Sequence, residues 1–341
     1  MLDPALETLV LPVLEESIAL PDTGELLFLR ARMGPSLRQL PRERLVCHQT
    51  FAPDANALER SGFKTVFEVE GQFPFIMVLP PRQRKEARAL LAQAVKACGE
   101  GGMVVAAISN TEGAKTCEAD LKALAGLDGN KSKNKCRVFW TQISKETVNQ
   151  DLLDEWLQLD SVHEIEQGRY KSRPGVFSWD HIDHASKLLV KHLPATLQGK
   201  GADFGAGLGY LSDEVLTKCP KVSGMDLVEA EKRALDLAKL NLSSAAKPVE
   251  FIWADVTATL KGAYDFIVMN PPFHTGKADR TDLGQAFIVS ASKALKPAGS
   301  LWMVANRHLP YEHTLEKHFD RFEIVGDEGG FKIIHAVKAR K

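Results

Sequence analysis

Short apolar runs alternate with segments of helical periodicity along the second half of the chain. Runs rich in Val, Ile, Leu and Phe predict strands at residues 200–204, 222–225, 249–254, 264–269 and 300–305. The segments between them have apolar residues at helical spacing and predict helices at 181–191, 211–217, 230–240 and 281–295. Strands that alternate with helices are typical of a parallel α/β sheet.

The second half closes with a predicted helix at 311–319 and two more apolar runs, at 322–325 and 331–338. The last two runs are joined through Asp327-Glu-Gly-Gly330, and glycines of this kind favour a tight hairpin. We therefore expect a seven-stranded, mostly parallel sheet in which the last strand is antiparallel.

The first half has a similar alternation. It predicts strands at 26–32, 45–51, 73–79, 103–109 and 136–143, with helices at 1–20, 82–98 and 112–125. We expect the polar segment 129–135 to be a loop, 149–159 to be a connecting helix, and 163–174 to be irregular.

The two halves share a sequence pattern that points to duplication. Phe75-Ile-Met-Val-Leu-Pro-Pro-Arg82 aligns with Phe266-Ile-Val-Met-Asn-Pro-Pro-Phe273, and the elements that follow keep the same order. Leu79 and Arg82 replace Asn270 and Phe273, so we expect the first copy to be degenerate and non-catalytic. The predicted organisation is a degenerate domain at 1–147, a helical linker at 148–172 and a catalytic domain at 173–341.

Composition limits the classes of protein to which this chain can belong. The net charge of −1 over 341 residues means that any nucleic-acid binding must come from local basic patches. The five cysteines are scattered without a Cys-x-x-Cys pair, so we expect free thiols and no metal site. The N-terminus has no signal-peptide pattern, and no apolar run approaches the ~18 residues of a membrane span. We expect a cytoplasmic monomer with no membrane partner.

The strand predicted at 264–269 ends in a loop suited to a planar amine. Pro271 and Pro272 cannot donate to a sheet and must stop the strand at Asn270. The Asn270 side-chain oxygen and the Pro271 carbonyl can both accept from an exocyclic NH2 group, while Phe273 can stack on the ring. Hydrogen bonds of this kind would aim the nitrogen lone pair at an electrophile, so catalysis would be mostly positioning.

A glycine turn between a predicted strand and helix indicates a nucleotide-like cofactor. Gly205, Gly207 and Gly209 let the backbone turn tightly and approach a ligand closely. This pattern alone also occurs in nicotinamide dehydrogenases, which need glycine where Tyr210 stands. Asp203, just before the turn, suits a cationic ligand better than a pyrophosphate, and therefore favours S-adenosylmethionine.

Two acids follow at expected strand ends. Asp226 lies about 20 residues beyond the glycines, where a carboxylate can accept from ribose hydroxyls. Asp255 follows the strand at 249–254, where a carboxylate can accept from an adenine amino group. Either acid alone would more often be a helix cap or a solvated charge. Together with the glycine turn and the Asn-Pro-Pro-Phe loop, they predict a cofactor site.

These motifs resemble those of bacterial ribosomal RNA guanine-N2 methyltransferases of the small-subunit (16S) type, which are class I S-adenosylmethionine-dependent enzymes. The resemblance rests on Pro174-Gly-Val-Phe-Ser178, Asn270-Pro-Pro-Phe-His274, Val304-Ala-Asn306 and Leu309-Pro-Tyr311. It implies two tandem Rossmann-like methyltransferase domains, with Asn270, Pro271, Pro272 and Phe273 holding guanine. The implied cofactor-binding residues are Phe177, Asp203, Gly205, Ala206, Gly207, Asp226, Leu227, Asp255, Val256 and Asn270. The implied partner is ribosomal RNA or a ribosomal subunit.

Several alternatives stay open. Arg307-His308 is more similar to the related large-subunit (23S) enzymes, and DNA adenine or protein glutamine methylation would use a related loop. A non-enzymatic RNA-binding assembly factor would not need to keep Asn270. For RNA contacts we expect three basic clusters, at residues 30–44, 82–88 and 131–137.

Overall fold

The computed structural model describes residues 3–258, 262–272, 274–275, 278–279 and 281–340. The chain divides into two compact units. The first holds residues 1–162 with 173–175, and the second holds 163–172 with 176–341. The segment 148–172, expected to be a linker, gives helix α5 (Gln150–Gln158) to the first unit and a hairpin to the second.

A seven-stranded sheet with the order β3-β2-β1-β4-β5-β7-β6 forms the centre of the first unit. The strands are β1 (Leu26–Leu29), β2 (Leu45–His48), β3 (Lys64–Val66), β4 (Phe73–Val78), β5 (Cys98–Ser109), β6 (Gly129–Lys133) and β7 (Cys136–Gln142). Strand β7 is antiparallel to both of its neighbours, and the other pairs are parallel.

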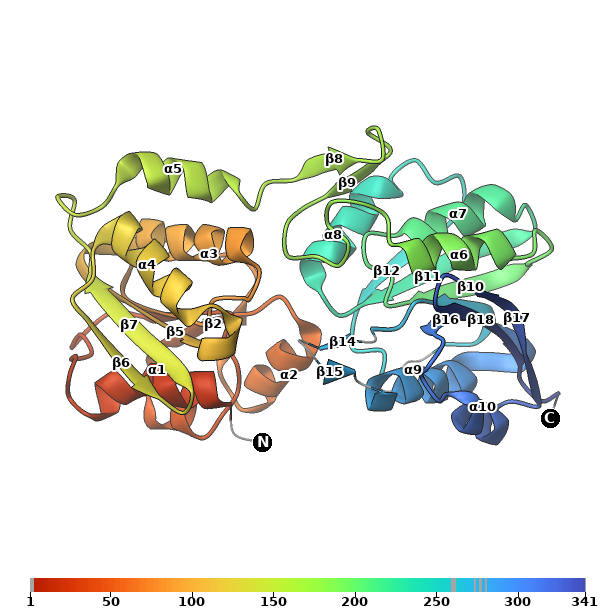
Figure 1. Cartoon of the computed structure of the whole chain (residues 1–341), viewed down its shortest axis with the longest axis horizontal. Helices are drawn as coiled ribbons and strands as arrows, with labels where there is room; N and C mark the ends of the chain where they lie inside the picture. The colour runs from red at the N-terminus through yellow and green to blue at the C-terminus, as the bar shows by residue number, and fades with distance from the viewer. Residues whose placement is uncertain (1–2, 259–261, 273, 276–277, 280, 341) are drawn as a thin grey trace. The chain divides into compact units, whose positions relative to one another are not determined.

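Helices cover both faces of this sheet (Figure 1). The core on one face includes side chains of α1 (Pro4–Leu14) and α2 (Ala52–Arg60), and the core on the other includes α3 (Arg84–Ala97), α4 (Ala114–Ala125) and α5. Three short 3-10 helices complete the unit: η1 (Ser36–Gln39), η2 (Arg42–Arg44) and η3 (Asn110–Glu112).

The second unit has the same construction, with the order β12-β11-β10-β13-β16-β18-β17. Its main strands are β10 (Gly199–Phe204), β11 (Val222–Glu229), β12 (Val249–Trp253), β13 (Tyr264–Met269), β16 (Leu295–Asn306), β17 (Arg321–Glu328) and β18 (Phe331–Val337). As expected, β18 is the antiparallel strand.

The helices of the second unit also form two layers (Figure 1). The core on one face includes α6 (His184–His192), α7 (Tyr210–Lys218) and α8 (Lys232–Asn241), and the core on the other includes α9 (Thr281–Ala294) and α10 (Glu312–His318). Two small hairpins complete the unit: β8 (His163–Ile165) with β9 (Tyr170–Ser172), and β14 (His274–Thr275) with β15 (Ala278–Asp279).

The predicted duplication is confirmed by the matching strand order and by finer detail. Strands β4 and β13 have the same sequence of buried and half-buried positions, and so do β5 and β16. Both sheets also have a register irregularity at the same place, between Phe73 and Phe75 in β4 and between Tyr264 and Phe266 in β13. The two units are therefore copies of one α/β fold.

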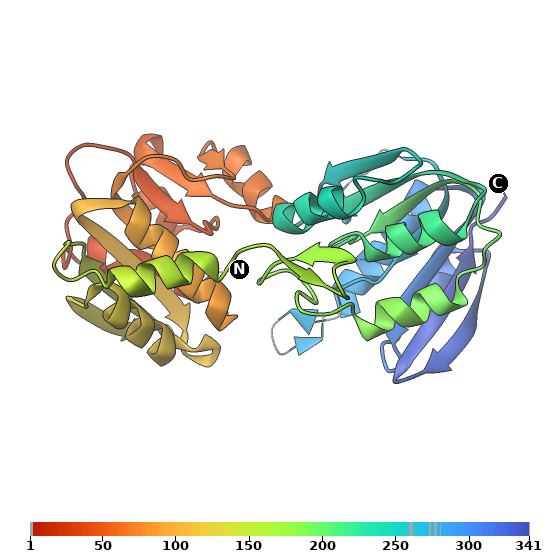
Figure 2. The same cartoon turned by 90° about the horizontal axis from the view of Figure 1, so that it is seen from above.

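Two segments that we expected to lack regular structure contain strands. Residues 129–133, expected to be a loop, form the edge strand β6, which is polar because an edge strand has only one partner and is mostly exposed to water. Residues 163–174, expected to be irregular, include the hairpin β8–β9. This hairpin lies beside α8 (Figure 2), where the Lys171 amide donates to the Asn241 side chain over 2.7 Å.

Candidate active site

The carboxyl ends of β10, β11, β12 and β13 lie at one edge of the second sheet, because these neighbouring strands are parallel. Ligands of open α/β sheets bind outside this edge. Each of these four strands has an acidic or amide side chain within two residues of its end. These side chains are Asp203, Glu229, Asp255 and Asn270.

The glycine turn after β10 has two kinds of glycine. Gly209 has a φ of +92°, and a Cβ added there would lie 2.8 Å from Leu242 Cδ1, so this glycine lets α7 start close to α8. Gly207 has a φ of +55°, and an added Cβ would meet no atom of the described residues within 4 Å. Gly207 therefore borders open space, as a residue that a ligand approaches should.

Asp203 is completely buried at the end of β10. Its Oδ2 accepts from the Ser212 hydroxyl over 2.8 Å, while its Oδ1 has no hydrogen-bond partner in the described part of the chain. Burial raises the pKa of this carboxyl to about 7. A buried carboxylate oxygen that lacks a donor fits a cationic or hydrogen-bond-donating ligand.

Asp226 does not stand where the sequence analysis expected it. We predicted that strand 222–225 ends just before this residue, but β11 continues to Glu229 and Asp226 lies within it, opposite Ala202 of β10. It is 4% exposed, and its Oδ2 lies 2.9 Å from the Tyr264 hydroxyl and 2.8 Å from Lys200 Nζ. Leu227 is fully buried in the core. These contacts give Asp226 a structural role within the sheet.

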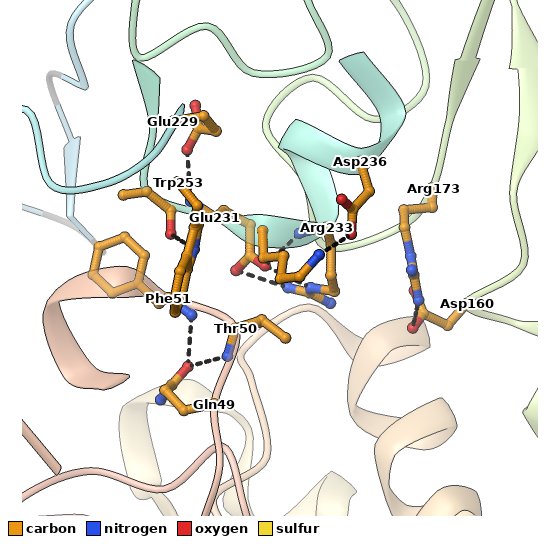
Figure 3. Close-up of polar contacts among 12 residues, drawn as sticks. Gln49, Thr50, Phe51, Asp160, Arg173, Glu229, Glu231, Arg233, Asp236 and Trp253 are labelled. Carbon is orange, nitrogen blue, oxygen red and sulfur yellow. Dashed lines mark hydrogen bonds and ion pairs between the residues drawn. The ribbon is translucent and has the colours of Figure 1, made fainter. Parts of the chain in front are cut away.

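Glu229 takes the place at the strand end that was expected for Asp226 (Figure 3). Its Oε2 accepts from the Gly207 amide over 2.8 Å, and its Oε1 accepts from the Glu231 amide over 2.7 Å. Burial raises the pKa of this half-buried carboxyl. The apolar pair Leu227-Val228, which extends the strand past Asp226, is the sequence signal that could have identified Glu229.

Asp255 follows β12 after one intervening residue. Its Oδ1 accepts from both the amide and the hydroxyl of Thr257, over 2.8 and 2.7 Å. These bonds hold the carboxylate in a fixed local turn. Val256 is 2% exposed and belongs to the core.

Asn270 directly follows β13, and its amide is oriented by two acceptors on another element. Its Nδ2 lies 2.8 Å from Asp183 Oδ2 and 2.8 Å from Ser186 Oγ, at the start of α6. A carboxylate only accepts, so the Nδ2 group must face Asp183 and the side-chain oxygen must face away from it. No donor among the described residues bonds this oxygen.

The other predicted site residues lie around this edge or outside the described ranges. Pro271 is buried and Pro272 is exposed. Phe273, predicted to stack on the substrate, lies outside the described residues. Ala206 is buried in the glycine turn, and Phe177 is 68% exposed on the segment that precedes α6.

Comparisons with known proteins bear directly on this arrangement. The sequence profile of the methyltransferase small domain matches residues 167–335. Proteins called ribosomal RNA small subunit methyltransferase C are similar over most of both chains. The relative from Psychromonas ingrahamii is 28% identical over 81% of this chain and 79% of its own, and that from Cronobacter sakazakii is 30% identical over 76% and 74%.

The chain belongs to the ribosomal RNA small subunit methyltransferase C family. A solved structure agrees with this assignment: the 16S rRNA N2 G1207 methyltransferase of T. thermophilus, in complex with AdoMet and guanosine. It superimposes with a TM-score of 0.79 and is 25% identical, covering 98% of this chain and 92% of its own. The family resemblance and the two-domain fold expected from the sequence are therefore confirmed.

In the first unit, other residues stand at the positions that correspond to the candidate cofactor residues of the second unit. The strand registers align Phe28 with Asp203, Arg30 with Gly205, and Gln49 with Glu229. Gln49 Oε1 accepts from the amides of Thr50 and Phe51, as Glu229 accepts from Glu231 in the second unit (Figure 3).

Arg30 stands at the position of the first unit that corresponds to Gly205. It keeps a left-handed φ of +53°, as Gly205 has +75°. Its guanidinium donates over 2.9 Å to the carbonyl of Leu79, the residue that aligns with Asn270. In the first unit, Phe28 thus stands in place of the buried carboxylate of Asp203. Arg30 stands in place of Gly205, and its side chain extends from the end of β1 to the end of β4.

Six of the thirteen cations in the three predicted basic clusters form ion pairs with carboxylates in the described part of the chain. The pairs are Arg32 with Asp3, Arg84 and Arg88 with Asp120, Lys131 and Lys133 with Glu15, and Arg137 with Glu118. A cation that is tied to a carboxylate offers less charge to a phosphate. The RNA-binding role of these clusters stays a prediction, for which the exposed Arg82 and Lys135 are better candidates.

Within the described ranges, no three His, Cys, Asp or Glu side chains gather in a way that could hold a metal ion. No helix among the residues that the structure describes is long and apolar enough to cross a membrane.

Proposed function

We propose that this enzyme transfers a methyl group from S-adenosylmethionine to the exocyclic N2 amine of a guanine in 16S ribosomal RNA. The observation that carries the proposal is the orientation of Asn270. Its two N–H groups are directed to Asp183 and Ser186, so its oxygen is left to accept from an amino group. The relatives named above, which act on the small-subunit RNA, support 16S rather than 23S RNA as the substrate.

The residues at the edge of the second sheet fit the cofactor. Asp203 offers a buried carboxylate oxygen that lacks a donor, and Gly207 borders open space. Glu229 would accept from the ribose hydroxyls, in place of Asp226, and Asp255 would accept from the adenine amino group. Phe177 and Ala206 remain cofactor contacts implied by the family resemblance. When bound, S-adenosylmethionine supplies an electrophilic methyl group on a sulfonium ion.

The protein's contribution to the reaction is orientation of the amine. The lone pair of the guanine N2 is delocalised into the ring, which makes this nitrogen a weak nucleophile. Hydrogen bonds from its two protons to Asn270 Oδ1 and the Pro271 carbonyl hold the nitrogen and direct its lone pair to one side. Fixing a reactant in this way lowers the barrier through orientation.

We propose that the enzyme acts on 16S RNA either as free RNA or within a ribosomal subunit. We place it in the cytoplasm and propose that one chain is sufficient for activity. A target base within folded RNA must leave its stack before its amine can reach the loop that follows β13.

The test is methyl transfer from labelled S-adenosylmethionine to 30S subunits, 50S subunits, free 16S RNA and free 23S RNA. We expect label on N2-methylguanosine after nuclease digestion of a small-subunit substrate, and its loss in Asn270→Ala. Cofactor affinity is measured in parallel by calorimetry. Label on 23S RNA would reassign the substrate, and cofactor binding without transfer to any RNA would overturn the proposal.

A further inference from the structure

Asn270 is held by residues that no motif in the sequence singled out. Asp183 and Ser186 stand at the start of α6, more than 80 residues before Asn270 in the chain. We propose that Asp183 and Ser186 are positioning residues that fix the amide orientation of Asn270 so that its oxygen accepts from the substrate amine. This inference rests on the proposed function of Asn270.

The geometry of the three side chains satisfies both amide hydrogens of Asn270. One Nδ2 atom lies 2.8 Å from an acceptor on Asp183 and 2.8 Å from an acceptor on Ser186. An amide NH2 group has two hydrogens, so each acceptor can take one. Ser186 is 8% exposed, and Asp183 and Asn270 are half-buried, so these bonds are partly shielded from water.

The chemistry of Asp183 sets the direction of the amide. If the Asn270 side chain turned over by 180°, its oxygen would face the Asp183 carboxylate, and two acceptors would oppose each other. The turned amide would also present its NH2 group to the substrate amine, where two donors would oppose each other. The carboxylate therefore disfavours the orientation that cannot bind the substrate.

Helix α6 holds the two acceptors in place. Asp183 is its N-cap, and the same Oδ2 atom that binds Asn270 accepts from the Ser186 amide over 2.8 Å. Ala185, Leu188 and Leu189 pack into the core of the second unit. The strand end that carries Asn270 and the helix that orients it thus belong to one packed body.

The bonds can be removed with little change to the helix. Asp183→Gly deletes the acceptor, and glycine at an N-cap costs only a few tenths of a kcal/mol relative to aspartate. Ser186→Ala deletes the hydroxyl and places a good helix former within α6. Asp183→Asn is the conservative variant, because its oxygen can still cap the helix and accept from Asn270. Asn149→Gly removes the N-cap of α5 in the first unit and is the matched control.

The first readout is kinetic. We expect kcat on the RNA substrate to fall about tenfold in Asp183→Gly and about threefold in Ser186→Ala, with the KM for RNA and the affinity for S-adenosylmethionine unchanged within about twofold. Asp183→Asn should recover most of the rate, and Asn149→Gly should keep the wild-type rate. Equal losses of rate and cofactor affinity would overturn the proposal.

The second readout does not depend on activity. In protein labelled with ¹⁵N-asparagine, the Asn270 side-chain NH2 signals are assigned by their loss in Asn270→Ala. We expect slowed solvent exchange of both hydrogens in the wild type and in Asp183→Asn. One hydrogen should lose this protection in Asp183→Gly and one in Ser186→Ala. Unchanged Asn270 signals in both variants would overturn the positioning role, even if methyl transfer failed for another reason.

Discussion

The Tyr264 hydroxyl donates a hydrogen bond to Asp226 Oδ2 over 2.9 Å, across the strand that separates β13 from β11. Lys200 on the intervening strand binds the same oxygen over 2.8 Å. This buried contact lies within the sheet, whereas the candidate cofactor residues stand at its edge. We therefore assign Asp226 to the stability of the fold and the residues at the edge of the sheet to ligand binding.

Removal of Asp226 should therefore reduce stability and spare the cofactor site. Asp226→Ala leaves the buried Tyr264 hydroxyl without its acceptor, so we expect the free energy of unfolding to fall by about 2–3 kcal/mol. Asp226→Asn keeps an acceptor and should cost less. Urea unfolding measures both variants, and calorimetry should find wild-type affinity for S-adenosylmethionine in the folded protein. A large loss of affinity at unchanged stability would return Asp226 to the cofactor site.

Substitution of Glu229 should instead reduce cofactor affinity and leave stability almost unchanged. Glu229→Gln replaces one accepting oxygen with an NH2 group and removes the charge, so we expect the Kd for S-adenosylmethionine to rise about tenfold or more. The matched control is Gln49→Ala, at the aligned position of the first unit, which should leave the Kd unchanged. If calorimetry gave the same Kd for wild type and Glu229→Gln, the ribose contact would have to be sought elsewhere.

The two glycines of the turn should fail in different ways. A methyl group at Gly207 enters open space, so Gly207→Ala should lose cofactor affinity at a stability cost of only about 1–2 kcal/mol, which comes from its left-handed φ. At Gly209 the methyl group would meet Leu242 and Ala238, so Gly209→Ala should lower the melting temperature more. Thermal unfolding and cofactor titration are measured for both variants. A lower melting temperature for Gly207→Ala than for Gly209→Ala would contradict this prediction.

Asp203 should make cofactor binding depend on pH near neutrality. Its pKa is raised to about 7, so the free protein carries a proton on Asp203 at pH 6 that a cationic ligand must displace. We expect affinity for S-adenosylmethionine to rise with pH from 6 to 8, by up to about tenfold per pH unit below the pKa. In Asp203→Asn, the affinity for S-adenosylmethionine should change little with pH. An equal dependence of affinity on pH in the wild type and the variant would contradict a role of Asp203 in binding the cofactor.

The raised pKa of Asp203 has the opposite effect on folding, because it makes the folded state less stable as the pH rises. The folded state holds this proton between about pH 4 and pH 7, where the unfolded chain has released it. The contribution of Asp203 to stability is therefore present below about pH 4 and decreases as pH rises through 7. Comparison of unfolding free energies of wild type and Asp203→Asn across this range isolates the contribution, and a difference that did not change with pH would refute it.

Much of the fold could be predicted because its signals are local. The strand at 264–269 has the predicted bounds, since an apolar run meets Pro271 and Pro272 directly. The glycine turn was placed correctly for the same reason. The acid at the end of β11 was missed because Asp226 interrupts an apolar run that continues through Leu227 and Val228. Its contacts with Tyr264 and Lys200, which come from other strands, stabilise this charge within the strand.

Partners that are distant in sequence could not be predicted. Nothing near Asn270 in the chain indicates that Asp183 and Ser186 orient it, because the contact depends on how α6 packs on the sheet. The ion pairs of the basic clusters could not be predicted for the same reason. Arg84 and Arg88 are one helical turn apart in sequence, but Asp120, which binds both, comes from another helix.

The first unit, in which Arg30 replaces a glycine of the turn, can serve as an internal control for measurements of ligand binding to the second unit. The first unit repeats the strand order of the second, yet an arginine side chain there bonds the carbonyl of the residue that corresponds to Asn270. Hydrogen exchange at β1 and β4 therefore reports general effects of temperature, buffer or additives, while the same strands of the second unit report these effects and ligand binding together. The change in exchange on adding ligand, compared between the two halves of one chain, separates occupancy from these general effects.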